Sequence, residues 1–213
     1  MVSLSHRALA PNRVRWLSMF IWVLAVLVAL ASFRFLVAQI DLVMPAMVHH
    51  ARDRPLALYA HIGFAPIALA LLPLQFSQRL RARYHMVHRW LGRVYVASIL
   101  IAGGAGVVLA LTTSAGPVAA AGFLGLSALW LTTTGAAVWY AMRRRIALHR
   151  IWMIRSAALT LAAVTLRLYL PVGMATVGFD ASYPAIAWLC WVPNLLIGEW
   201  LLARDRASQP LGA

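Results

Sequence analysis

Six long apolar stretches, separated by short polar segments, dominate the hydrophobic pattern of the chain. Each is close to the roughly 20 residues that an α-helix needs to cross the hydrocarbon core of a bilayer. The pattern therefore predicts an all-α fold, a polytopic transmembrane bundle of six helices in which the second to fifth form the core. The predicted helices are Trp16–Ala38, Leu56–Phe76, Leu91–Thr112, Val118–Met142, Trp152–Pro171 and Pro184–Ala203.

The composition supports a membrane protein. Hydrophobic residues make up 63% of the 213 positions and charged residues 11%, whereas about 25% charged residues is usual for a soluble domain. A chain this apolar cannot bury its surface in one core, so the lipid bilayer is its natural solvent. The net charge is +14. Because the basic residues, all arginines, cluster between apolar stretches, we interpret them as topology signals and lipid contacts, and expect no nucleic-acid partner.

The arginines also predict which side of the membrane each segment faces. Fourteen lie in or beside the N-terminal segment, the second and fourth connections and the tail, whereas the other connections carry two. The positive-inside rule then places both termini in the cytoplasm of a bacterial-type inner membrane. The predicted organisation is a basic cytoplasmic segment (residues 1–15), the six-helix transmembrane domain (16–203) and a cytoplasmic tail (204–213).

The first apolar stretch has a second interpretation, a cleaved signal peptide, because it follows basic residues and contains Ala29-Leu30-Ala31. Its apolar core runs from Leu17 to Ser32, whereas the apolar region of a signal peptide usually has about 7–15 residues. We therefore favour an uncleaved helix.

Familiar catalytic motifs are absent from the sequence, so whether the protein is an enzyme stays open. The single cysteine, Cys190, excludes a disulfide within the chain and a cysteine-based zinc site. No protease, kinase, phosphate-loop or nucleophile-elbow motif occurs. Five acidic residues are too few for a carboxylate cation site of the usual kind, which disfavours a Na⁺ or Ca²⁺ transporter. We expect Glu199 to pair with Arg155 or Arg93.

Polar side chains recur on one face of three predicted helices, at spacings of three and four residues. Lipid penalises such groups, so these faces should turn toward neighbouring helices, and their residues are candidates for function. The candidate cofactor-binding residues are His61 and Gln75 on the second helix, His88 and Tyr95 at the third, and His149 and Arg167 at the fifth.

The sharpest hypothesis is a b-type haem. His88 and His149 lie at the same predicted side of the membrane, imidazole is a common ligand of haem iron, and helix bundles hold such cofactors between facing helices. His61 would then lie near a quinone site on the outer side. The alternatives are structural histidines at headgroup level, a small transporter or lipid-handling protein with a path from Arg167 to His149, and a non-catalytic scaffold. The cofactor, substrate, redox partner and oligomeric state are left open.

Four stretches of the sequence form recognisable motifs. They are Ala60-His61-Ile62-Gly63, Pro73-Leu74-Gln75-Phe76, the run from His88 to Val96, and the run from His149 to Pro171. Together these motifs resemble the bacterial predicted-membrane-protein family built on domain of unknown function 2306. The likeness covers roughly the second to sixth helices and implies a multi-pass membrane protein without bringing an established reaction. A more distant likeness to b-type membrane cytochromes is architectural only.

Overall fold

The structure, a computed structural model, consists of packed α-helices. It describes residues 11–207, with side chains from residue 16 onward. Within that range it has no strand, and six helical spans are long and apolar enough to cross a membrane. The predicted all-α class and the six spans are therefore confirmed. The outer parts of the predicted terminal segments, residues 1–10 and 208–213, lie outside the described residues.

The six spans comprise eight α-helices and one short 3-10 helix, and four further short helices lie in two of the connections. The spans are α1 (Pro11–Ser32) with η1 (Phe33–Leu36), α4 (Pro55–Phe76), α6 (His85–Leu111), α7 (Gly116–Met142), α8 (Ile146–Thr160) with α9 (Ala162–Thr176), and α10 (Phe179–Leu189) with α11 (Val192–Ala207). The connecting helices are α2 (Ile40–Val43), η2 (Pro45–Met47), α3 (Val48–Asp53) and α5 (Gln78–Arg83).

Several boundaries differ from the prediction. The third helix begins at His85 rather than Leu91, so His88 lies inside its first turn. The fifth begins at Ile146 rather than Trp152. Hydropathy marks the part of a helix that lies in hydrocarbon, whereas long arginine side chains allow the helix to continue into the headgroup region. The predicted boundaries were therefore too short at these ends.

The last two spans are each interrupted near the middle, which the sequence pattern did not predict. The fifth breaks at Leu161, directly after Thr160, whose hydroxyl donates to the carbonyl of Ser156 at 2.8 Å. Such bonds to the preceding turn often bend helices. The sixth breaks at Cys190–Trp191, just before Pro193. A proline has no N–H to donate to the preceding turn, so it favours an interruption there.

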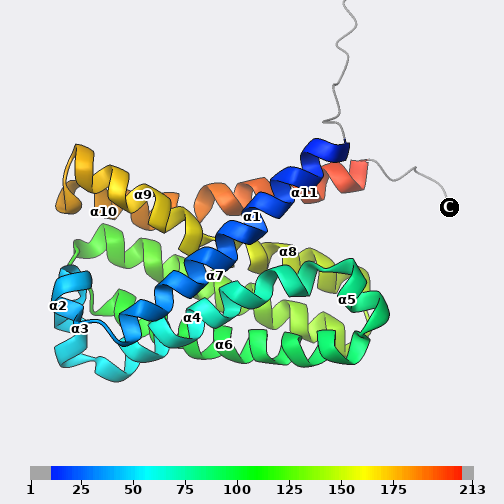
Figure 1. The fold of residues 1–213 in the computed structure, drawn as a ribbon, viewed down its shortest axis with the longest axis horizontal. Helices are drawn as coiled ribbons and strands as arrows, with labels where there is room; N and C mark the ends of the chain where they lie inside the picture. Colours follow the sequence, from blue (N-terminus) through cyan, green and yellow to red (C-terminus); the bar gives the residue numbers. More distant parts are fainter. Residues whose placement is uncertain (1–10, 208–213) are drawn as a thin grey trace, which may run out of the picture.

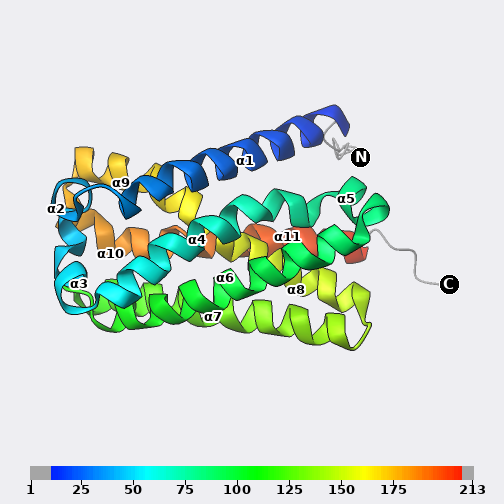
Figure 2. The same ribbon diagram turned by 60° about the horizontal axis from the view of Figure 1, so that its bottom comes forward.

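The core bundle consists of α4, α6, α7 and α8. Helix α6 packs between α4 and α7, and α8 packs on α7, while α1 covers α4, α10 covers α7 and α9, and α11 covers α8. The two ends of the described chain and α5 lie at one end of the molecule, and α2 and α3 at the other (Figures 1 and 2). We call these the arginine-rich end, after Arg143–Arg145 and the arginines around α5, and the α3 end.

Small residues bring the core helices close together. A Cβ on Gly103 of α6 would lie 2.8 Å from the side chain of Leu131 on α7. A Cβ on Gly122 of α7 would lie 2.9 Å from the backbone carbonyl oxygen of Ala187 on α10. Small residues at helix contacts are typical of membrane bundles, where packing rather than the hydrophobic effect drives helix association.

Candidate functional site

A buried hydrogen-bond network, which we call the central network, lies at mid-height in the core bundle. The Tyr95 hydroxyl of α6 lies 3.0 Å from Ser156 Oγ and 2.9 Å from Thr160 Oγ1, both on α8. Trp130 Nε1 of α7 donates to Thr160 Oγ1 at 2.9 Å, and Thr134 Oγ1 lies 2.8 Å from Ser156 Oγ. These five side chains are at most 7% exposed. They join α6, α7 and α8 through polar contacts in a region that water does not reach.

Every polar hydrogen in the central network has an acceptor within the protein. Thr134 donates to the Trp130 carbonyl at 2.7 Å, and Thr160 donates to the Ser156 carbonyl. Ser156 can then donate to Thr134, and Tyr95 to Ser156 or Thr160. Satisfied networks of this kind stabilise a single packing arrangement and offer little to a ligand.

His149 lies on α8 between the central network and the arginine-rich end, about two helical turns before Ser156. Its Nδ1 is 2.9 Å from the carbonyl oxygen of Ala137 on α7. A carbonyl only accepts, so Nδ1 carries the proton and Nε2 of the neutral ring keeps its lone pair. Histidines that bind metals typically have this arrangement, in which the second ring nitrogen donates to a carbonyl and fixes the ring. His88 of α6 lies within electrostatic reach of His149.

Two buried polar atoms near His88 have no hydrogen-bond partner among the described residues. They are His88 Nδ1 and Gln75 Nε2. The Gln75 side chain of α4 lies against the next turn of α6, because a Cβ on Gly92 would be 3.2 Å from Gln75 Oε1. Buried polar groups are nearly always paired, so two unpaired atoms on adjacent turns indicate a position where a further polar group is accommodated. Gln75, His88 and His149 thus lie around one region.

The other two predicted site residues, His61 and Arg167, lie on the opposite side of the central network. His61 Nδ1 is 2.8 Å from the carbonyl oxygen of Ala102 on α6, which again leaves Nε2 with its lone pair. The ring also lies beside Gly106, where a Cβ would be 3.4 Å from Nδ1. Arg167 of α9 is near enough to His61 to act on it electrostatically. The six predicted residues therefore do not form one site: Tyr95 belongs to the central network, and the other five divide between the two regions on either side of it.

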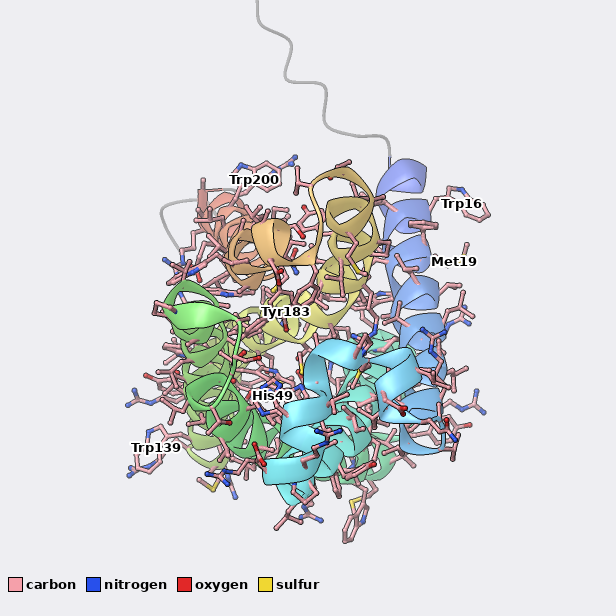
Figure 3. The ribbon with its side chains drawn as sticks, turned by 90° about the vertical axis from the view of Figure 1, so that its left-hand side faces the viewer. Trp16, Met19, His49, Trp139, Tyr183 and Trp200 are labelled. Carbon is pink, nitrogen blue, oxygen red and sulfur yellow. The ribbon has the colours of Figure 1, made fainter. Side chains whose placement is uncertain are left out.

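A further polar cluster lies at the α3 end. The rings of His49 and His50 are 3.9 Å apart, and their Nδ1 atoms lie 3.5 Å from Ser114 Oγ and 3.4 Å from Thr112 Oγ1. Burial, with a smaller contribution from His49, lowers the pKa of His50 to about 4, so this imidazole is neutral at pH 7. Figure 3 shows His49 and Tyr183 lying toward the middle of this end, whereas Trp16, Trp139 and Trp200 point outward.

Sequence analysis missed the contribution of α7 to the polar interior. Its buried face carries Ser127, Trp130 and Thr134, and the carbonyl of Ala137 holds His149. The spacings of three and four residues were available as a signal. Threonine and tryptophan do not ionise, so they give a weaker signal in an apolar helix than histidine or arginine does.

An ion pair ties α8 to α11 away from these clusters. Arg155 Nε and Nη2 donate to the two carboxylate oxygens of Glu199 at 2.5 and 3.0 Å. This two-point geometry is the strong form of an arginine–carboxylate pair. Of the two partners expected for Glu199, Arg93 instead stacks over the Trp90 ring, with its guanidinium carbon 4.6 Å from the ring centroid. Arg155 therefore has a structural partner.

Six apolar spans around a polar interior define the protein as a multi-pass α-helical membrane protein. A family model described as "Predicted membrane protein (DUF2306)" matches residues 58–202, more than half of the chain. The chain belongs to this family, as its His-Arg motifs suggested. No curated protein and no solved structure matches the chain significantly.

Proposed function

We propose that this membrane protein binds a b-type haem at the arginine-rich end of the bundle, where His88 and His149 are the residues that would hold its iron. The observation that carries the proposal is the hydrogen bonding of the two imidazoles, each of which has a ring nitrogen without a partner among the described residues. His149 is oriented by the Ala137 carbonyl with a free Nε2, and the neighbouring His88 has a buried Nδ1 without a partner. Two histidines on facing helices are a common ligand set for haem iron in helix bundles.

The surrounding residues fit the chemistry of this cofactor. Gln75 Nε2, which lacks a partner, supplies a hydrogen-bond donor on the same side of α6. Arg81 of α5 lies within electrostatic reach of His88 and offers positive charge to the carboxylates of the porphyrin. When bound, a b-type haem supplies one-electron transfer within the membrane. The chain's own part is to hold the two rings and exclude water.

The test is an absorption spectrum of the protein purified from haem-replete cells. We expect a Soret band and a reduced-minus-oxidised difference spectrum in the wild type, and their loss in His88→Ala and in His149→Ala. The matched control is His85→Ala, which removes an exposed histidine one turn away on α6. A colourless wild-type protein that takes up no added haemin, or a His149→Ala variant with an unchanged spectrum, would contradict the proposal.

We further propose that the arginine-rich end faces the cytoplasm of a bacterial inner membrane. Arginines around α5, at Arg143–Arg145 and near the end of α11 lie at that end, whereas the connections at the α3 end carry only Arg52 and Arg54 in the described range. Positive charge is retained on the cytoplasmic side during insertion. The predicted quinone contact at His61 stays a prediction.

A further inference from the structure

A small cavity opens at the α3 end, between the connection from α6 to α7 and the first turns of α10. Its volume is about 310 Å³, within the range of roughly 300–1,000 Å³ that is usual for small-ligand sites in proteins. It lies at the opposite end of the bundle from the proposed haem. Its wall combines polar, aromatic and small side chains, which include Ser114, Ala115, Phe179, Asp180, Tyr183 and Pro184.

Two stacked aromatic rings form the apolar part of the cavity wall. The rings of Phe179 and Tyr183, one turn apart on α10, have centroids 4.4 Å apart and planes inclined by 24°. Phe123 of α7 also packs on Tyr183, with ring centroids 5.4 Å apart. Because packing already holds these rings in place, a ligand that contacts them does not have to order them, and the wall is preformed.

The ionised group of the cavity wall is a carboxylate, and none of the described residues that line the cavity is basic. Asp180 is exposed, and no arginine of the described range lies within ion-pair distance of it. An ionised carboxylate only accepts hydrogen bonds, and the hydroxyl oxygens of Ser114 and Tyr183 can accept them as well. In a chain with a net charge of +14, this cavity therefore has a locally negative wall made of acceptors.

An imidazole with an unpaired nitrogen lies beside Ser114. His49 Nδ1 is 3.5 Å from Ser114 Oγ, while His49 Nε2 is buried and has no hydrogen-bond partner among the described residues. Figure 3 shows that His49 and Tyr183 both lie toward the middle of this end of the molecule. When Nδ1–H donates to the Ser114 hydroxyl, Nε2 is an acceptor. Buried polar atoms are nearly always paired, so this nitrogen indicates that a hydrogen-bond donor is accommodated next to the cavity.

We propose that this cavity binds the primary ammonium group of a small organic cation, with Asp180 as its counter-ion and Phe179 and Tyr183 as its aromatic wall. An ammonium group only donates hydrogen bonds, so it complements a wall of acceptors, and its charge is attracted both by a carboxylate and by aromatic faces. An anion would be repelled by Asp180. Ca²⁺ and Mg²⁺ take six or more oxygen ligands, for which a single carboxylate is insufficient.

The ammonium group can come from two sources. One is a soluble amine, and the other is the headgroup of phosphatidylethanolamine, because the cavity lies at the end of the transmembrane spans, where headgroups are found. This inference does not depend on the proposed haem.

The experiment titrates the full-length protein, in a non-ionic detergent, with three probes of similar shape. Benzylammonium carries the positive charge and an aromatic ring, benzyl alcohol is neutral, and benzoate is an anion. Isothermal titration calorimetry measures the affinity for each probe. The variant is Asp180→Asn, which removes the charge but keeps the shape. The matched control is Asp41→Asn, which removes another exposed aspartate, on α2 at the same end and outside the cavity wall.

We expect benzylammonium to bind the wild type and Asp41→Asn equally well, and to bind Asp180→Asn about five- to tenfold more weakly, the loss expected for a charge-assisted hydrogen bond to an exposed carboxylate. Benzyl alcohol and benzoate should bind the wild type more weakly than benzylammonium does. Both aspartates are exposed, so both variants should fold, which far-UV circular dichroism checks.

Competition with lipid identifies the source of the ammonium group. Displacement of benzylammonium by phosphatidylethanolamine, but not by phosphatidylglycerol, assigns the cavity to a lipid headgroup. Displacement by neither lipid assigns it to a soluble amine. A wild-type protein that does not bind benzylammonium, equal affinities for the three probes, or an equal loss in Asp180→Asn and Asp41→Asn overturns the proposal.

Discussion

Thr160 should contribute more to stability than any other hydroxyl of the central network, because it is the acceptor for a tryptophan. Replacing Thr160 with valine keeps the shape of the side chain but leaves Trp130 Nε1, in a residue 7% exposed, without an acceptor. An unpaired buried donor costs roughly 1–3 kcal/mol. In contrast, Tyr95→Phe removes a hydroxyl whose partners, Ser156 and Thr160, keep other hydrogen bonds.

The two variants should differ measurably in how much free energy of unfolding they lose. A single hydrogen bond between membrane helices is worth on average roughly 0.6 kcal/mol, so we expect Tyr95→Phe to lower the free energy of unfolding by about that amount. For Thr160→Val we expect a loss of about 2 kcal/mol. Unfolding in mixed micelles with increasing SDS, followed by far-UV circular dichroism, measures both losses in the same way.

A double-mutant cycle isolates the cause. In a Trp130→Phe background the donor is already absent, so Thr160→Val should cost about 1 kcal/mol less than it does in the wild type. The cycle subtracts the packing defect that Trp130→Phe itself introduces. If Thr160→Val costs the same in both backgrounds, or no more than Tyr95→Phe, the assignment of Thr160 as an essential acceptor is wrong.

Two further outcomes follow from packing and from charge. Gly122→Ala should destabilise the protein by about 1–3 kcal/mol, because the added methyl meets the Ala187 backbone at 2.9 Å, whereas Gly104→Ala, which meets nothing within 4 Å, should be neutral or slightly stabilising in the same SDS assay. A membrane-impermeant maleimide added to spheroplasts with an intact inner membrane should label Ser114→Cys at the α3 end and spare Arg144→Cys at the arginine-rich end, and the reverse pattern would refute the proposed orientation.

Hydropathy predicted the number of spans well because the physical constraint is strong. A helix that crosses hydrocarbon must be apolar over about 20 residues, and this pattern survives without any knowledge of tertiary contacts. The positions of helix ends and interruptions depend on weaker and more local interactions. The start of α6 at His85 and the break at Leu161 depend on snorkelling side chains and on one hydroxyl bond, and neither leaves a clear hydropathy signal.

The residues of the candidate site were predicted in part, because the sequence pattern shows which face of a helix is polar but not which helix that face contacts. Ser156 and Thr160 share the helical face of His149 and Arg167 and are buried, but periodicity could not reveal that Tyr95 and Trp130 contact them there. Contacts between helices depend on rotation and depth, which a single helix does not determine.

The polar groups of this protein fall into two kinds. Some have all their hydrogen-bond partners within the protein and act structurally, whereas others lack a partner and are candidates for binding a ligand. In the central network every hydrogen-bond donor has an acceptor within the protein, so no polar group there is left unpaired for a ligand. The unpaired atoms of His88 and Gln75 lie on one side of that network, and the unpaired Nε2 of His49 lies on the other. Polar groups that the protein itself leaves unpaired in an apolar environment carry a cost that a bound ligand removes. Changes in the central network should therefore reduce stability without selectively reducing binding, whereas changes at His88 or His149 should first reduce binding of the proposed haem.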